Sequence, residues 1–263
     1  MLKFSPCIEV MFTDLEFEDR FAAVKAAGLS HAEFWGWTHR NLEKIAKASK
    51  DSGVKISSMC IGSKDEGLAT SFKQRALLTS ESSEILKKVC AESIEAAKHL
   101  GVPSLIITTG NERSDLPRED QRRNLLASLR AVAPLFEASG ITAVVEPLNI
   151  LHDHKGYFLS SGYEAFDIIK EVNSPRIKLL YDIYHQQITE GNLIPNIRAN
   201  IDLIGHFHVA DNPGRNEPGT GEINYKNVFA AIDALDYDGI IGLEYRPSID
   251  PYDALKNTLA LAP

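Results

Sequence analysis

Residues 204–222, with the sequence IGHFHVADNPGRNEPGTGE, contain the features on which the fold assignment depends. The first six have the apolar character of a buried strand and include His206 and His208. Alternate residues of a strand point to the same side, so both histidines are predicted to share one face. A polar loop with Asp211, Arg215 and the run PGTG at 218–221 follows. Histidines at the carboxyl end of a strand, followed by such a loop, are typical of the functional edge of parallel α/β folds.

The rest of the chain alternates predicted strands with predicted helices. Strands are expected over residues 4–12, 31–34, 55–61, 104–109, 141–146, 177–182, 204–209 and 239–244. Helices are expected over residues 13–28, 42–53, 80–101, 117–140, 188–200 and 224–235, and two more are expected to begin at residues 161 and 250. Four of these helices end at a glycine, which readily adopts the left-handed conformation needed there: Gly28, Gly53, Gly101 and Gly140.

This repeat of strand and helix predicts a single (β/α)₈ TIM barrel over residues 1–263. Each unit would have about 33 residues, a normal size for such a barrel. A doubly wound open sheet is the alternative, but no G-x-G-x-x-G follows the first predicted strand and no G-x-x-x-x-G-K-[ST] occurs. No linker divides the chain, and residues 62–80 are expected to be a loop that forms a lid or part of the rim.

Composition and charge narrow the classes of partner. The 263 residues are 44% hydrophobic, which suits one large core, and the net charge is −8 without a basic run. Nucleic acid is therefore not expected as a partner. Cys7, Cys60 and Cys90 are too scattered for a disulfide framework or a cysteine zinc site. Because neither a signal peptide nor a run of about 18 apolar residues occurs, a cytoplasmic protein without membrane contact is expected.

The ends of four consecutive predicted strands carry side chains that bind metals. They are Glu146, Asp182, His208 and Glu244. One acid at a strand end is also explained as a helix cap, but four such residues at one edge of a parallel sheet predict a shared site. Three carboxylates and an imidazole suit Mn²⁺, Mg²⁺ or Co²⁺, and a dication would relieve the repulsion between the carboxylates.

The motifs around these residues resemble the hydroxypyruvate isomerase family. This family belongs to the xylose isomerase-like barrels, which also include tagatose and psicose 3-epimerases. The resemblance spans nearly the whole chain and rests on EPLN at 146–149, DIYH at 182–185, residues 206–225, GLEY at 242–245, residues 12–21 and GYFL at 156–159.

The resemblance implies roles for individual residues. It implies that Glu146, Asp182, His208 and Glu244 bind the divalent metal and that Glu146 and Glu244 also move protons. Two further residues, His185 and Arg215, match positions that contact substrate oxygens in the related epimerases. The related barrels often form dimers or tetramers, so a homodimer or homotetramer is expected.

The expected reaction is a proton transfer through an enediolate on a small sugar or sugar acid. The planar fork of Arg215 favours a carboxylate, which makes hydroxypyruvate, interconverted with tartronate semialdehyde, the leading substrate. Two segments depart from the family pattern, PCIEV at 6–10 and WGWTHR at 35–40. They lie on or after early strands, where such barrels shape the substrate pocket, and Trp35 is a candidate wall of that pocket.

The sequence is also compatible with other functions. The same scaffold would also suit a ketose 3-epimerase, a lyase or dehydratase acting on an oxidised sugar, a metal-dependent endonuclease, or a barrel that only binds sugar. His206 is expected to bond a backbone group rather than a metal. Glu9 and Glu33 would either bind substrate or pair with other polar groups. The run at 218–221 lacks the lysine of a phosphate loop and is expected to be a tight turn that positions Arg215.

Overall fold

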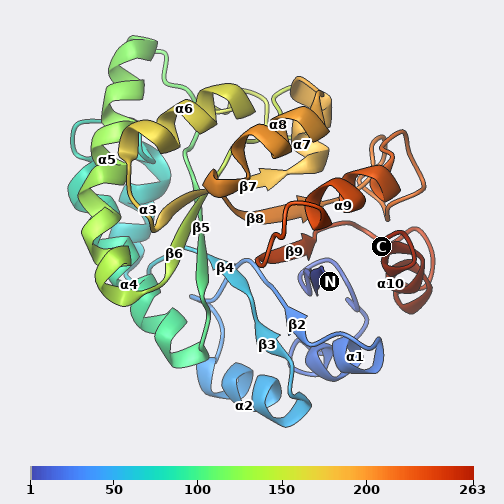
Figure 1. Cartoon of the computed structure of the whole chain (residues 1–263). Helices are drawn as coiled ribbons and strands as arrows, with labels where there is room; N and C mark the ends of the chain where they lie inside the picture. The colour runs from blue at the N-terminus through green and yellow to red at the C-terminus, as the bar shows by residue number, and fades with distance from the viewer. Residues whose placement is uncertain (1) are drawn as a thin grey trace.

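A computed structural model describes residues 2–263, in which parallel strands form the wall of a barrel inside a ring of helices (Figure 1). The strands are β1 (Lys3–Pro6), β2 (His31–Ala32), β3 (Lys55–Ile56), β4 (Ser58–Cys60), β5 (Ser104–Thr108), β6 (Thr142–Glu146), β7 (Ile177–Asp182), β8 (Ile204–Val209) and β9 (Ile240–Leu243). They form a seven-stranded sheet of order β1-β9-β8-β7-β6-β5-β4 and a separate pair, β2-β3.

The barrel closes through the short strands β2 and β3. The amide of Glu33 donates to the carbonyl of Pro6 at 3.0 Å, and the amide of Ile8 donates to the carbonyl of Glu33 at 2.9 Å, which joins β1 to β2. Only Ser57 separates β3 from β4, so these two strands occupy one position in the wall. This arrangement confirms the predicted (β/α)₈ barrel.

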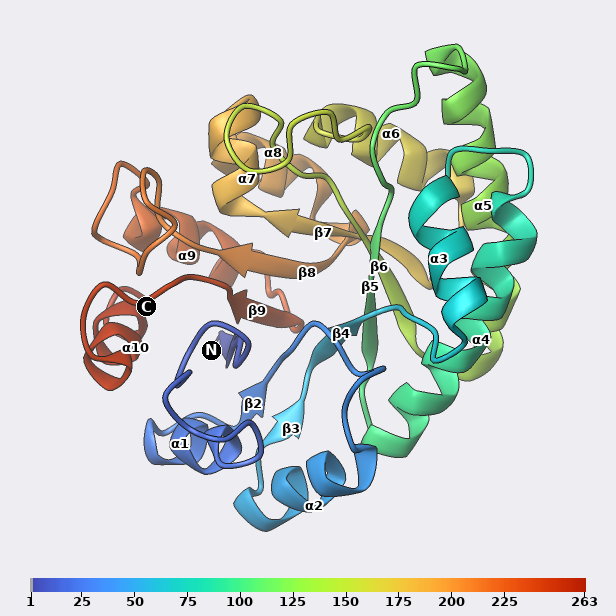
Figure 2. The same ribbon diagram turned by 180° about the vertical axis from the view of Figure 1, so that it is seen from behind.

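The helices cover the outside of the barrel, as the view from behind in Figure 2 also shows. They are α1 (Arg20–Ala26), α2 (Leu42–Ser52), α3 (Glu66–Arg75), α4 (Ser82–Leu100), α5 (Arg118–Ser139), α6 (Gly162–Val172), α7 (Ile183–Thr189), α8 (Leu193–Asn200), α9 (Tyr225–Asp233) and α10 (Pro251–Leu259), with a 3₁₀ turn at Ile201–Leu203. No helix within the described range is long and apolar enough to cross a membrane.

Local capping explains where several helices begin and end. The predicted start of a helix at Ser161 is confirmed, and the Ser161 hydroxyl caps it by accepting from the amide of Glu164 at 3.2 Å. The carboxylate of Asp250 likewise accepts from the amide of Tyr252 at 2.9 Å, where α10 begins. Gly53 follows α2 with φ 71°, as expected for a glycine that ends a helix.

The first predicted strand and helix are both shorter than expected. Only Lys3–Pro6 is a strand, and α1 begins at Arg20, so the prediction that this helix begins at Thr13 is wrong. The intervening segment winds into turns around the Arg20 guanidinium. This group donates to the carbonyls of Ile8 at 2.7 Å and Leu15 at 3.1 Å. Because Arg20 provides hydrogen bonds to these carbonyls, they do not need a partner in a neighbouring strand, and the segment can be irregular.

Two further helix predictions need correction. Residues 62–80, expected to be a loop, contain α3, which lies beside α4 (Figures 1 and 2). None of its side chains is buried, so it lacks the apolar stripe that reveals a helix in sequence. The helix expected over 188–200 is two helices. Asp182 accepts from the amide of His185 at 3.1 Å and starts α7 directly after β7. Gly191 and Asn192, both at positive φ, separate α7 from α8. The proposed lid or rim role of residues 62–80 stays a prediction.

Apolar packing fills the space between the strands and the helices and also the barrel interior. A small interior cluster consists of Ile106, Val144 and Leu180, with Cys60 packed against it. Cys7, Cys60 and Cys90 are all free thiols. The carboxyl ends of β5, β6 and β7 follow the residues of this apolar cluster along the barrel axis.

We expect Gly53→Ala to lower the free energy of unfolding by about 1 kcal/mol, because alanine is strained at positive φ. A new Cβ would meet no atom within 4 Å, so the cost comes from the backbone alone. Gly53→Asn should cost less, since asparagine tolerates this conformation. Urea denaturation measures the order of stability, and an alanine variant as stable as the parent would contradict this explanation.

Candidate active site

Four strand ends bring their polar side chains together inside the barrel mouth. Glu146 ends β6, Asp182 ends β7, His208 lies next to the last residue of β8, and Glu244 follows β9. All four side chains are buried, and one ligand atom of each lies within 4.8 Å of the corresponding atoms of the other three. We call this group the carboxylate cage.

The negative charge of the cage carboxylates is partly balanced by His208 within the cage and by Arg215 beside it. His208 Nδ1 lies 3.4 Å from Glu146 Oε1 and 3.6 Å from Glu244 Oε2. Burial alone would lower the pKa of His208, but Glu244 and Glu33 raise it well above its usual value. Burial would raise the pKa of Glu244, yet His208 and Arg215 hold it below the usual range. Burial keeps the pKa of Asp182 raised.

The donor set of the cage fits a divalent cation. Three carboxylates and one imidazole offer the oxygen and nitrogen ligands found around Mn²⁺, Mg²⁺ and Co²⁺. His208 Nδ1 is fully buried, and no described residue makes an aligned hydrogen bond with it. A buried nitrogen of this kind that faces carboxylates is suited to coordinate a cation.

Two side chains cover Glu244 from the mouth of the barrel. The Trp35 indole Nε1 donates to Glu244 Oε1 at 2.6 Å, and Arg215 Nη2 donates to Glu244 Oε2 at 2.5 Å. The Arg215 guanidinium also lies 5.2 Å from the ring centroid of Tyr184. The exposed fraction is 37% for Trp35 and 3% for Trp37. Of the two tryptophans, only Trp35 therefore lies at the mouth of the barrel.

Asp211 organises the loop that carries Arg215. Its buried carboxylate accepts from the amides of Asn212 at 2.9 Å, Gly219 at 2.7 Å and Ile223 at 3.1 Å. A Cβ at Gly221 would lie 2.2 Å from the carbonyl oxygen of Asn212, so this close approach needs glycine. These contacts agree with the interpretation of residues 218–221 as a tight turn rather than a phosphate loop.

His185 presents one free nitrogen beside the cage. Its Nδ1 accepts from the backbone amide of Asn149 at 3.3 Å and lies 2.7 Å from the Asn149 side-chain nitrogen. Burial lowers the pKa of His185 to about 4, so the ring is neutral at pH 7 and carries its proton on Nε2. Nε2 lies 3.6 Å from Asp182 Oδ2 without an aligned hydrogen bond, which leaves a donor for another group.

Glu33 lies behind the cage and pairs with two histidines, which is the second of the two roles expected for it, although the sequence did not identify its partners. His206 Nε2 is 2.9 Å from Glu33 Oε2, so His206 bonds a carboxylate and not the backbone group expected from sequence. His208 Nε2 is 3.1 Å from Glu33 Oε1. Burial would raise the pKa of Glu33, but His208 and His206 lower it to about 2. Glu9 instead pairs with Arg40 at 2.9 Å.

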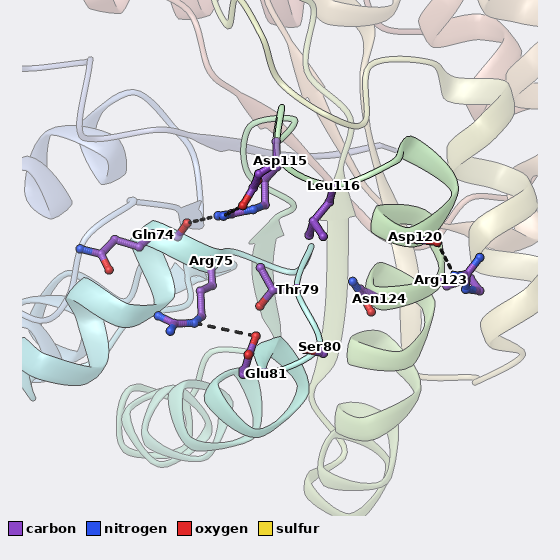
Figure 3. A pocket seen from close by; sticks show the side chains of 11 residues that line it. Gln74, Arg75, Thr79, Ser80, Glu81, Asp115, Leu116, Asp120, Arg123 and Asn124 are labelled. Carbon is purple, nitrogen blue, oxygen red and sulfur yellow. Dashed lines mark hydrogen bonds and ion pairs between the residues drawn. The ribbon is translucent and has the colours of Figure 1, made fainter.

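A separate surface hollow of about 720 Å³ lies between the α3–α4 junction and the start of α5 (Figure 3). Its charged side chains already pair with one another, as Arg113 with Asp115, Arg75 with Glu81 and Arg123 with Asp120. None of the predicted site residues lines it. The candidate active site is therefore the carboxylate cage and not this hollow.

Comparison with known proteins identifies relatives that are sugar-acid isomerases by name and a family model of the same fold. The family model described as xylose isomerase-like TIM barrel matches residues 21–261. The 2-oxo-tetronate isomerase of Cupriavidus necator is 31% identical over 94% of each chain. The hydroxypyruvate isomerase of Escherichia coli is 30% identical over 96% of this chain and 100% of its own.

Solved structures show the same fold. A protein described as AP endonuclease, family 2, from Brucella melitensis has a TM-score of 0.90 and 26% identity over 100% of both chains. The 3-keto-D-glucoside 4-epimerase of E. coli has a TM-score of 0.77 and 22% identity over 99% of this chain and 98% of its own, which supports the fold alone. Taken together, the family match and the curated relatives show that this chain is an enzyme of the sugar isomerase and epimerase class and belongs to the xylose isomerase-like TIM-barrel family.

Proposed function

We propose that this enzyme is a cation-dependent isomerase of a small α-hydroxy carbonyl sugar acid, and that it interconverts hydroxypyruvate and tartronate semialdehyde. The observation that carries the proposal is the carboxylate cage, whose four ligand atoms lie within 4.8 Å of one another, with Arg215 2.5 Å from one of its oxygens. The names of two relatives, 2-oxo-tetronate isomerase and hydroxypyruvate isomerase, indicate substrates of this chemical class, which supports the same class here.

Glu146, Asp182, His208 and Glu244 would hold the cation, which we expect to be Mn²⁺, Mg²⁺ or Co²⁺. When bound, such a cation polarises a substrate carbonyl and lowers the free energy of the enediolate. The cage is buried, so it excludes water and strengthens every charge interaction inside it.

The two glutamates would move the carbon-bound proton. In hydroxypyruvate a base removes a proton from C3, the C2–C3 double bond of the enediolate forms, and an acid returns a proton to C2. A hydroxyl proton moves from the C3 oxygen to the C2 oxygen in the same conversion. Glu244 is ionised, since its pKa lies below the usual range, and an ionised carboxylate can accept the proton. The free Nε2 donor of His185 suits the oxygen that gains a proton.

Arg215 and Trp35 would select the substrate. The guanidinium fork pairs with a carboxylate through two parallel hydrogen bonds, a geometry that a lone hydroxyl does not offer. The exposed face of Trp35 would wall the pocket beside Glu244. A ketose 3-epimerase or a lyase would use the same acid–base pair. The substrate group that Arg215 binds therefore distinguishes these candidates, since a sugar acid offers a carboxylate and a ketose offers only hydroxyls.

Replacing either glutamate tests the proton transfer. We expect Glu146→Gln and Glu244→Gln each to lower kcat by about 10²- to 10⁴-fold, because the amide cannot accept or return the proton. Glu92→Gln is the control, since Glu92 is hydrogen-bonded to Ser63 and Lys64 and does not contact the cage. Turnover is measured by NMR with bound cation quantified for each variant. Near-normal turnover in both cage variants would rule out the mechanism.

Removing the cation tests the cofactor requirement. We expect chelation to abolish isomerisation and Mn²⁺ or Mg²⁺ to restore it. Cation at about 100 times its Kd should also stabilise the fold by about 2.7 kcal/mol through mass action. Thermal unfolding and metal analysis of the same samples provide the measurement. Full activity in protein shown to be free of metal would contradict the proposal.

Arg215→Lys tests the choice of a carboxylate substrate. Lysine keeps the charge but loses the fork, so we expect KM for hydroxypyruvate to rise about 10-fold or more. Because Arg215 also contacts Glu244, kcat/KM for a neutral ketose serves as the internal control. An equal loss for the acid and for the ketose would show that Arg215 acts through Glu244 and does not bind a carboxylate.

A further inference from the structure

Glu33 has both carboxylate oxygens engaged behind the carboxylate cage. Its Oε2 accepts from the Ser58 hydroxyl at 2.9 Å and lies 2.9 Å from His206 Nε2. Its Oε1 lies 3.1 Å from His208 Nε2. Glu33, His206 and Ser58 are all buried, so water does not satisfy these groups. The contacts of Glu33 with His206 and His208 therefore explain why these three side chains lie together, and the group does not call for a second cation.

The two nitrogens of His208 face in different directions. Nε2 meets Glu33, whereas Nδ1 lies 3.4 Å from Glu146 Oε1 and 3.6 Å from Glu244 Oε2. A neutral imidazole has one N–H donor and one lone pair. If Nε2 carries the proton toward Glu33, Nδ1 keeps its lone pair for the cage. The carboxylate thus selects the tautomer that a metal ligand needs.

Gly242 on β9 packs against the same contact. A Cβ at this position would lie 2.4 Å from Glu33 Oε1 and 2.6 Å from His208 Cδ2. Any larger residue would therefore push the Glu33 carboxylate and the His208 ring apart. The absence of a side chain at Gly242 lets β1–β2, β8 and β9 meet at this point.

We propose that Glu33 is a positioning residue that holds the His208 ring with Nδ1 toward the cage and so raises the affinity of the cage for its divalent cation. The inference rests on the cation-dependent function proposed above and assigns a role to a residue outside the four ligands. Neither His208 nitrogen has an aligned hydrogen bond, so a small turn of the ring completes the contact with Glu33 when the cation binds.

The test measures Mn²⁺ binding to purified protein by the electron paramagnetic resonance signal of free Mn²⁺, without substrate. We expect Glu33→Gln to weaken binding about 10- to 100-fold, the usual effect of losing a carboxylate that orients a histidine ligand. Glu92→Gln is the matched control and should bind as the parent does, because its partners are Ser63 and Lys64. Circular dichroism and the Tm of the cation-free variants verify folding.

A double-mutant cycle separates positioning from a general structural role. In a His208→Ala background Glu33→Gln should cause no further loss of Mn²⁺ affinity, because Glu33 acts through the His208 ring. A structural effect on the barrel would weaken binding by the same factor in both backgrounds, and that result would overturn the inference. If Glu33→Gln does not fold, Gly242→Ala disturbs the same contact and is expected to weaken Mn²⁺ binding in the same way.

The outcomes also separate this inference from the proposed function. Parent protein that binds no Mn²⁺, Mg²⁺ or Co²⁺ would overturn both. Tight binding by the parent together with equal binding by the folded Glu33→Gln variant would overturn the role of Glu33 alone. Weaker binding by Glu33→Gln, with loss of the effect in the His208→Ala background, supports the positioning role.

Discussion

Repulsion between three buried carboxylates is the constraint on which the site depends. Glu146, Asp182 and Glu244 have few options inside a dry barrel mouth, because each ionised group needs an opposite charge or a strong donor. Arg215 supplies part of that compensation, and so does His208 while its ring is protonated. A divalent cation bound by the neutral His208 ring would take over and enlarge the share of His208. The parallel strands matter because they fix the carboxylates at one edge and prevent them from moving apart.

The polar layer behind the cage is a consequence of barrel closure. Glu33 comes from the end of β2, the short strand that completes the wall, and it meets His206 and His208 from β8 across the interior. Closure of the barrel therefore brings a buried negative charge to the two imidazoles. The same geometry leaves His208 Nδ1 facing Glu146 and Glu244, so the position of β2 and the geometry of the site depend on each other.

The sequence predicted the cage because its cause is local. Strand periodicity and parallel order determine where residues such as Glu146 and Glu244 emerge, and both can be recognised without coordinates. The partner of Glu33 could not be predicted, because its contact with His206 spans 173 positions and depends on barrel closure. The start of α7 was missed for a different reason, since Asp182 both ends a strand and caps a helix. The loop contacts of Arg215 and Trp35 with Glu244 also required the folded chain.

Proton exchange at the substrate carbon tests the combined role of the cage and its cation most directly. Hydroxypyruvate is incubated in D₂O with enzyme that has been stripped of metal, and with the same enzyme reloaded with Mg²⁺, while NMR follows carbon-bound deuterium and products. We expect the reloaded enzyme alone to incorporate deuterium and to form tartronate semialdehyde. Reloaded enzyme that binds Mg²⁺ but neither exchanges a proton nor forms product would contradict the proposed isomerase.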